Sequence, residues 1–254
     1  MKRNIILSFV AVLSIACSGS PKPFDSTVNL ERITVDRNSA EIASDSSYML
    51  SIAYLKPADA PQYLADSIMK HTKLLFASWF GIPEEFDLEA SVQRHMDEHL
   101  DHAARNDVPG RFPFRLTIAS APAYQNSRTI SFTYSWAVDE GGAHSNFGKY
   151  CFVLEKTTGR KLFLKDILRD EGEAEFMRIA ETEFKVQSGM KPEERMYVLY
   201  KFRNNRFHLT ETFAFADAGL TFHFNPYEIA PYSAGLITLA LPYESIATLI
   251  NFAP

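Results

Sequence analysis

Two runs near the middle of the chain alternate between apolar side chains and polar or small ones. The runs are Phe112–Ile118 and Ile130–Trp136, and hydroxyl-bearing residues separate the apolar positions of the second. A period of two places all the apolar side chains of a strand on one face of its sheet. The two runs therefore predict sheet strands that have one apolar face.

Helical periodicity occurs before and after these strands. Apolar residues three and four positions apart predict helices over Gln62–Phe80, Glu84–Arg105 and Glu171–Gln187. Further strands are expected at residues 48–54, 147–154, 161–164, 197–202, 212–215, 220–224 and 236–241, with a short closing helix at 244–250. Helices inserted among sequential strands indicate an α+β fold. We expect mainly antiparallel sheets with helices packed on one face, in two consecutive subdomains.

The composition is that of a globular protein. Of the 254 residues, 46% are hydrophobic and 22% are charged, which excludes disorder as the main character of the chain. A chain of this length can bury a core without disulfide bonds. The formal net charge of -5 argues against binding to nucleic acid, which needs a basic surface.

The first residues are typical of a secretory signal. Lys2 and Arg3 precede the apolar run Ile5–Ala16, which is too short to span a bilayer that needs about 20 apolar residues. The run ends at Cys17. Cleavage near this point as an ordinary secreted protein is one interpretation.

The segment Leu13–Cys17 resembles the lipobox of bacterial lipoproteins, although Leu stands one position earlier than usual. The resemblance implies cleavage after residues 1–16, a lipid on Cys17 and a membrane anchor, with residues 17–27 as a tether. Because Ser18 is not Asp, it also implies the outer membrane. The expected location is the cell envelope, on the periplasmic side.

Two later stretches carry a second resemblance. Residues 134–146 contain the sequence YSWAVDEGGAHSN, and residues 219–235 contain GLTFHFNPYEIAPYSAG. Together they resemble the extracellular module shared by RsiV-type anti-sigma factors and PdaC-type peptidoglycan deacetylases. The resemblance implies a PdaC-type accessory-like domain over 28–145 and an RsiV C-terminal-like domain over 146–254. It also implies binding of a lysozyme-like protein or peptidoglycan. In the deacetylases the module accompanies a separate catalytic domain, for which these 254 residues leave no room, and no cofactor is expected.

The same stretches supply the candidate ligand-binding residues. They are Tyr134, Gly141, Gly142, His144, Asn146, Tyr227, Glu228 and Tyr232. Tyrosines on loops are frequent anchors in recognition sites, and a His can donate, accept or titrate near neutral pH. The alternative is structural, with the glycines forming a tight turn and the tyrosines packing their own loop.

A competing interpretation is a zinc-dependent envelope hydrolase. His95, Glu98 and His99 fit the H-x-x-E-H pattern, in which two His on one helix face bind zinc and Glu acts as the base. His102 extends the same face. The alternative is a row of partly buried histidines along a helix. An envelope scaffold lipoprotein is the third hypothesis, and Cys151 is expected to be a buried, unreactive thiol.

Overall fold

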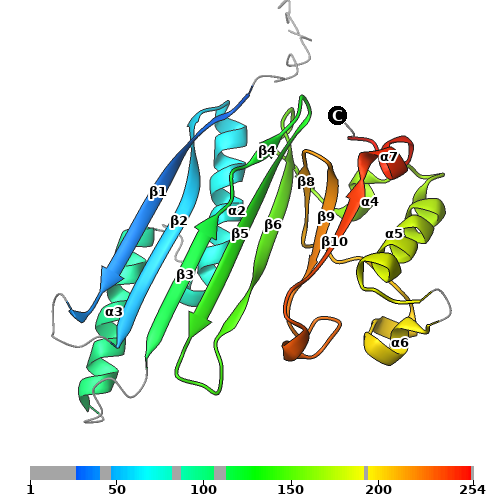
Figure 1. Cartoon of the computed structure of the whole chain (residues 1–254). Coiled ribbons are helices and arrows are strands. Elements are labelled where there is room, and N and C mark those ends of the chain that lie inside the picture. The colour runs from blue at the N-terminus through cyan, green and yellow to red at the C-terminus, as the bar shows by residue number, and fades with distance from the viewer. Residues whose placement is uncertain (1–26, 41–46, 82–86, 106–112, 192–193, 253–254) are drawn as a thin grey trace, which may run out of the picture.

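The computed structural model describes residues 27–40, 47–81, 87–105, 113–191 and 194–252. Cys17, with its predicted lipid, lies outside them. In the described part, no helix is both long and apolar enough to cross a membrane. The elements form an α+β fold built on two sheets, as the sequence predicts (Figure 1).

The first sheet has seven strands, in the order β1-β2-β3-β5-β6-β7, with β4 paired to β5. The strands are β1 Asn29–Asn38, β2 Tyr48–Asp59, β3 Phe114–Ser120, β4 Tyr124–Gln125, β5 Thr129–Asp139, β6 Asn146–Glu155 and β7 Lys161–Leu162. All its pairings are antiparallel except β2 with β3, whose connection contains two helices. A parallel pair needs such a long crossover.

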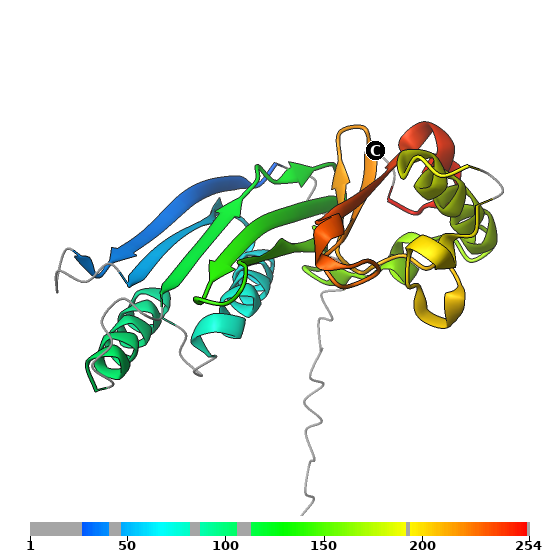
Figure 2. The same cartoon turned by 60° about the horizontal axis from the view of Figure 1, so that its bottom comes forward.

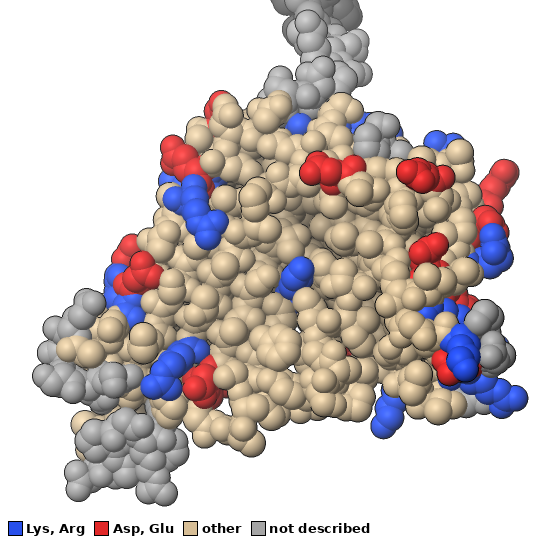
Figure 3. All heavy atoms as spheres, in the orientation of Figure 1, with Lys and Arg blue, Asp and Glu red and all other residues tan. Residues whose placement is uncertain are grey.

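Helices α2 (Gln62–Phe80) and α3 (Leu88–Arg105) cover one face of this sheet (Figure 2). The apolar stripe of α2 includes Leu64, Ile68 and Leu75, which are all buried against the strands. Each fully buried Leu or Ile side chain contributes roughly 1.5–3 kcal/mol to folding. The opposite face is not covered by these helices, and exposed small or polar residues such as Ser51, Thr117 and Ser135 lie on it. The centre of this open face is largely free of charged side chains (Figure 3).

The second sheet has three antiparallel strands in the order β10-β9-β8. The strands are β8 Phe213–Ala216, β9 Gly219–Phe224 and β10 Ile237–Pro242. The accompanying helices and turns are α4 Leu164–Ile167, α5 Glu173–Gln187, α6 Met196–Leu199, η1 Arg203–Asn205, η2 Tyr232–Ala234, α7 Tyr243–Ile246 and η3 Ala247–Leu249. Buried Phe176, Ala180 and Phe184 of α5 belong to the core of this half.

The strand expected at residues 197–202 is wrong. The structure has the helical turn α6 at Met196–Leu199 instead, and Val198 and Leu199 are largely exposed. A short apolar run fits a strand or a helix equally well, and only a neighbouring strand decides between them. No described strand pairs with this run.

Strand β6 connects the two halves of the molecule. Phe152 and Leu154 point into the first hydrophobic core, while Val153 between them points into the second. The predicted boundary at residue 145/146 lies in the hairpin between β5 and β6, inside the first sheet. The division into subdomains 28–145 and 146–254 therefore stays a prediction.

Candidate functional site

A cleft of about 650 Å³ lies between α2, the ends of β5 and β6, and the loop after β9. Trp79 of α2 and Trp136 of β5 line it, with ring centroids 5.7 Å apart and edge to face. Tyr150 of β6 and Tyr227 of the loop add two more aromatic side chains. Volumes of this size, lined by aromatic groups with a few polar ones, are typical of small-molecule sites.

Gly148 makes room for the cleft. A Cβ atom at this position would lie 2.8 Å from Cζ2 of Trp136 and 2.6 Å from Oδ1 of Asn225. Such distances are too short for any side chain. The glycine therefore lets the indole of Trp136 lie across β6 while the side chain of Asn225 approaches the strand.

Asn225 fastens the loop to the free edge of β6. The Lys149 amide donates to Oδ1 of Asn225 at 2.7 Å, and Nδ2 of Asn225 donates to the Lys149 carbonyl at 3.1 Å. The side-chain amide thus replaces a neighbouring strand. A further hydrogen bond closes the turn: the backbone N–H of Asn225 donates to the carboxylate of Glu228 at 2.9 Å.

Beside the cleft, Tyr227 forms a cluster with the exposed His144 and the partly exposed Tyr232, called here the aromatic rim. The rings of His144 and Tyr232 stack with centroids 3.8 Å apart, and the Tyr227 hydroxyl lies 3.3 Å from Nε2 of His144. The Tyr232 hydroxyl donates to the Ser145 carbonyl at 2.5 Å. Two segments that are distant in the sequence therefore meet.

Tyr227 combines exposure with backbone strain. Its side chain is 64% exposed, and its φ of 69° lies in the left-handed region. For a bulky residue that is not glycine, this conformation costs on the order of 1–3 kcal/mol. Strain of this kind persists where surrounding contacts impose it, and it is concentrated at binding sites.

Most of the other predicted site residues lie in the cleft or in the turns beside it. Asn146 lines the cleft. Gly141 has the left-handed φ of 75° that a tight turn requires, and its amide donates to the Asp139 carboxylate. Gly142 is exposed in the same turn and does not have a positive φ. Glu228 closes its own turn, as described above.

Tyr134 is a correction to the predicted site. Its side chain is fully buried, with the hydroxyl 3.2 Å from Oγ1 of Thr72, and burial raises its pKa. The alternation that makes β5 a strand places Tyr134 on the helix-covered face. It is a core residue and cannot contact a ligand at the surface.

Sequence reasoning missed Trp79, Trp136, Tyr150 and Gly148 as parts of a site. Both tryptophans occupy regular apolar positions of their predicted elements, so they are indistinguishable from core residues in the sequence. The available signal was weak: a glycine follows Asn146 and Phe147 inside an otherwise regular strand, and such a glycine often marks a close approach.

Two of the three histidines of α3, His95 and His99, contact residues of the sheet and of the segment before it. The Tyr48 hydroxyl lies 3.1 Å from Nδ1 of His95, and the ring of His95 lies 4.6 Å from that of Phe114. Nε2 of His99 lies 3.2 Å from Oγ of Ser47. Burial lowers the pKa of His95. His102 is exposed in the last turn of the helix.

Among the residues that the structure describes, no three His, Cys, Asp or Glu side chains are grouped to hold a metal ion. Cys151 is buried, as expected, and burial raises the pKa of its thiol to about 11, so the thiolate that would act as a nucleophile is disfavoured.

Comparison with known proteins identifies the C-terminal part of the chain. Residues 165–244 match the model of a family described as a protein of unknown function (DUF3298). This part of the chain is therefore similar to DUF3298 proteins. This is consistent with the predicted resemblance to the RsiV-type and PdaC-type module. No curated protein matches the chain.

Solved structures of DUF3298 proteins share the fold. One is a family member from Bacteroides fragilis NCTC 9343, with a TM-score of 0.67 and 19% identity over 91% of this chain and 96% of that chain. A family protein from Pseudomonas aeruginosa PAO1 has a TM-score of 0.66 and 20% identity over 90% and 96%. The DUF3298 match contains the loop with Tyr227 and Tyr232, whereas Trp79 and Trp136 precede it.

Proposed function

We propose that this protein is a lipid-anchored, non-enzymatic binding module of the periplasm, and that its aromatic cleft binds the glycan of peptidoglycan. The observation that carries this proposal is the cleft lined by Trp79, Trp136 and Tyr227. The resemblance of residues 134–146 and 219–235 to envelope modules supports the location and the class of ligand.

The chemistry of the cleft fits a sugar. Aromatic faces pack against the C–H faces of sugar rings, and nearby amide and hydroxyl groups can bind the ring hydroxyls. Asn146 and Ser78 are such groups and lie in the same cleft. The volume of about 650 Å³ can hold a small number of sugar rings.

Binding of a soluble peptidoglycan fragment tests this proposal. The chain has two Trp residues, and both line the cleft, so tryptophan fluorescence reports directly on this site. We expect a saturable fluorescence change that Trp79→Ala and Tyr227→Ala weaken at least about tenfold, or roughly 1.4 kcal/mol. The control Val198→Ala removes an exposed apolar side chain elsewhere and should bind normally. Equal binding by all the variants would contradict the proposal.

A lysozyme-like protein is the second candidate ligand, and the aromatic rim is the observation that favours it. Tyr227 and His144 are exposed and contact the partly exposed Tyr232, and the net charge of -5 is complementary to a basic protein. Tyr227→Ala and His144→Ala should then weaken binding of lysozyme, with Val198→Ala as the control. We expect the association constant to fall steeply as the salt concentration rises. Salt-independent binding would show that the charges do not contribute.

The proposed lipid anchor is tested separately. Wild-type protein should fractionate with the membrane and incorporate labelled fatty acid, whereas Cys17→Ser should do neither. Cys151→Ser serves as the control, since it removes the other cysteine of the chain. Incorporation of label into Cys17→Ser would show that the lipid is attached elsewhere, and no incorporation into the wild type would show that the lipid is absent.

A further inference from the structure

Strand β1 forms an outer edge of the first sheet. It pairs with β2 along its whole length and is the first strand in the sheet order. In Figures 1 and 2 no other strand of the described residues lies on its outer side. An edge strand presents a row of unpaired backbone groups that can pair with another strand.

At three places in the described part of the chain, a side-chain amide is bonded to backbone groups that no neighbouring strand pairs with. Asn225 pairs with Lys149 on β6, and Gln187 bonds both the N–H and the C=O of Ala240 on β10. Gln125 does the same for Val28, just before β1 begins. Within the described part of the chain, no side-chain amide is bonded in this way to β1 itself. The strand is ten residues long.

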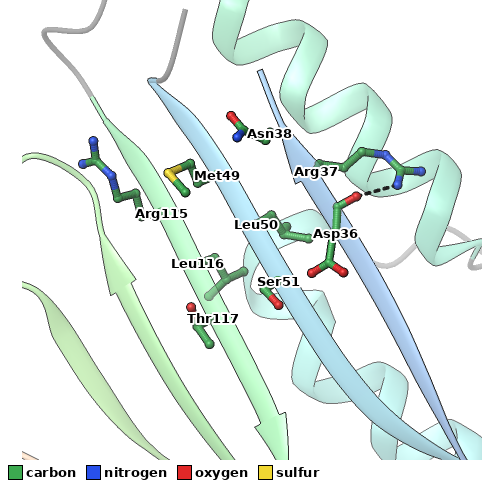
Figure 4. A pocket seen from close by; sticks show the side chains of 9 residues that line it. All are labelled: Asp36, Arg37, Asn38, Met49, Leu50, Ser51, Arg115, Leu116 and Thr117. Atoms are coloured by element: carbon green, nitrogen blue, oxygen red, sulfur yellow. Dashed lines mark hydrogen bonds between the residues drawn. The ribbon is translucent and has the colours of Figure 1, made fainter. Parts of the chain in front are cut away.

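The hydrogen-bond pattern shows which residues face outward. The Ser39 amide donates to the Tyr48 carbonyl of β2, so odd-numbered residues direct their backbone groups inward. Even-numbered residues, including Arg32, Thr34 and Asp36, direct theirs outward. The outward direction of the Asp36 carbonyl is supported by its hydrogen bond, which it accepts from the Arg37 side chain and not from β2 (Figure 4).

The sequence of β1 complements itself in one antiparallel register. When Thr34 is placed opposite Thr34 of a second copy, Arg32 lies opposite Asp36 and Glu31 lies opposite Arg37. Ile33 then lies opposite Val35. This register also brings outward backbone groups face to face, as an antiparallel pair requires. Moving the axis by one residue to Ile33 or Val35 keeps the backbone pairing but loses both pairs of opposite charges.

The side chains are placed to make these contacts. Glu31, Arg32 and Asp36 are exposed, and Asp36 lies beside Ser51 at a cavity of about 370 Å³ on the open face (Figure 4). Arg32 uses one guanidinium nitrogen to reach Ser120, and its other donors remain to meet a carboxylate. Arg37 already contacts Glu89 on α3 and could bridge to a second carboxylate.

We propose that β1 pairs with β1 of a second copy of this chain, so that the two first sheets form one continuous sheet across a twofold axis at Thr34. The opposite charges select the register, and they disfavour pairing with unrelated strands.

Charge reversal tests this interface with the full-length chain. Asp36→Arg places Arg opposite Arg in its own dimer, and Arg32→Asp places Asp opposite Asp. We expect wild-type protein to form a dimer in sedimentation experiments as its concentration rises, and each variant to remain a monomer. A mixture of the two variants should recover the dimer, because Arg then meets Asp at both positions.

The matched control reverses charges on the exposed back of α3, with Asp101→Arg and Arg105→Asp. These variants should dimerise like the wild type. Thermal unfolding followed by circular dichroism establishes that every variant folds. A wild type that stays monomeric at all concentrations, or a mixture that fails to recover the dimer, would overturn the proposal.

A cysteine cross-link tests the register independently. Opposed residues in an antiparallel pair have Cα atoms about 5.5 Å apart, which is within the range of a disulfide. Thr34→Cys should therefore form a disulfide-linked dimer on mild oxidation. The control Thr117→Cys is exposed on β3, away from the edge, and should not. Cross-linking of both to the same extent would contradict pairing through β1.

Discussion

At the scale of single residues, the cleft depends on the absence of a side chain at Gly148. Gly148→Ala would force its Cβ against Trp136 and Asn225, so both must shift. We expect a loss of about 1–3 kcal/mol in the free energy of unfolding, with altered tryptophan fluorescence. Denaturation by urea measures this. Gly142→Ala is the control, since its nearest neighbour would lie 4.0 Å away and its stability should stay within about 0.5 kcal/mol of the wild type.

His223 makes stability depend on pH. Burial, with a further contribution from Lys149, lowers its pKa from 6.5 to about 4. Between these values the unfolded chain binds a proton that the folded chain does not, so stability is full above pH 6.5 and falls as the pH is lowered. His223→Asn should reduce the loss between pH 7.5 and 5 by about 1–2 kcal/mol.

Asn at this position can keep a hydrogen bond to Thr238, which lies 3.0 Å from Nδ1 of His223. The free energy of unfolding at several pH values gives the comparison. His102→Asn, an exposed histidine on α3, is the control and should leave the slope unchanged. An unaltered slope in His223→Asn would assign the pH dependence to other groups.

At the scale of elements, the loop after β9 takes its position from a single side chain. Asn225→Ala removes both bonds to Lys149 on the free edge of β6. We expect faster hydrogen exchange over residues 226–235 and weaker binding of the peptidoglycan fragment, because the loop and Tyr227 lose their support. Asn146→Ala, an exposed residue of the same cleft, is the control for exchange. Unchanged exchange in Asn225→Ala would show that other contacts hold the loop.

The elements also show where sequence patterns are sufficient. Helix α2 begins and ends at the expected residues because its period of apolar side chains is sustained over 19 residues and Gly81, with a positive φ, ends it. The prediction of a strand at residues 197–202 failed because a run of a few apolar residues is too short to show either a helical or a strand periodicity. Its conformation depends on which strands are nearby, and none of the described strands pairs with it.

At the scale of the whole molecule, strand β6 should couple the two cores. Phe176 is fully buried in the second core, whereas both tryptophans lie in or against the first. Phe176→Ala should cost about 3–5 kcal/mol. Because Val153 joins the cores through β6, we expect tryptophan fluorescence and far-ultraviolet circular dichroism to shift together. A fluorescence transition that stays at the wild-type midpoint would show two independent folding units.

The sequence by itself determined the long helices, the α+β class and most of the strands, but it missed β1 and β4 and wrongly expected a strand where α6 lies. Local periodicity and turn residues contain that information, since they act through neighbours in the chain. Only the tertiary structure decided that Tyr134 is buried, that Trp136 borders a cleft above Gly148, and that Asn225 completes the edge of β6. These outcomes depend on distances between residues far apart in the chain, which no local pattern encodes.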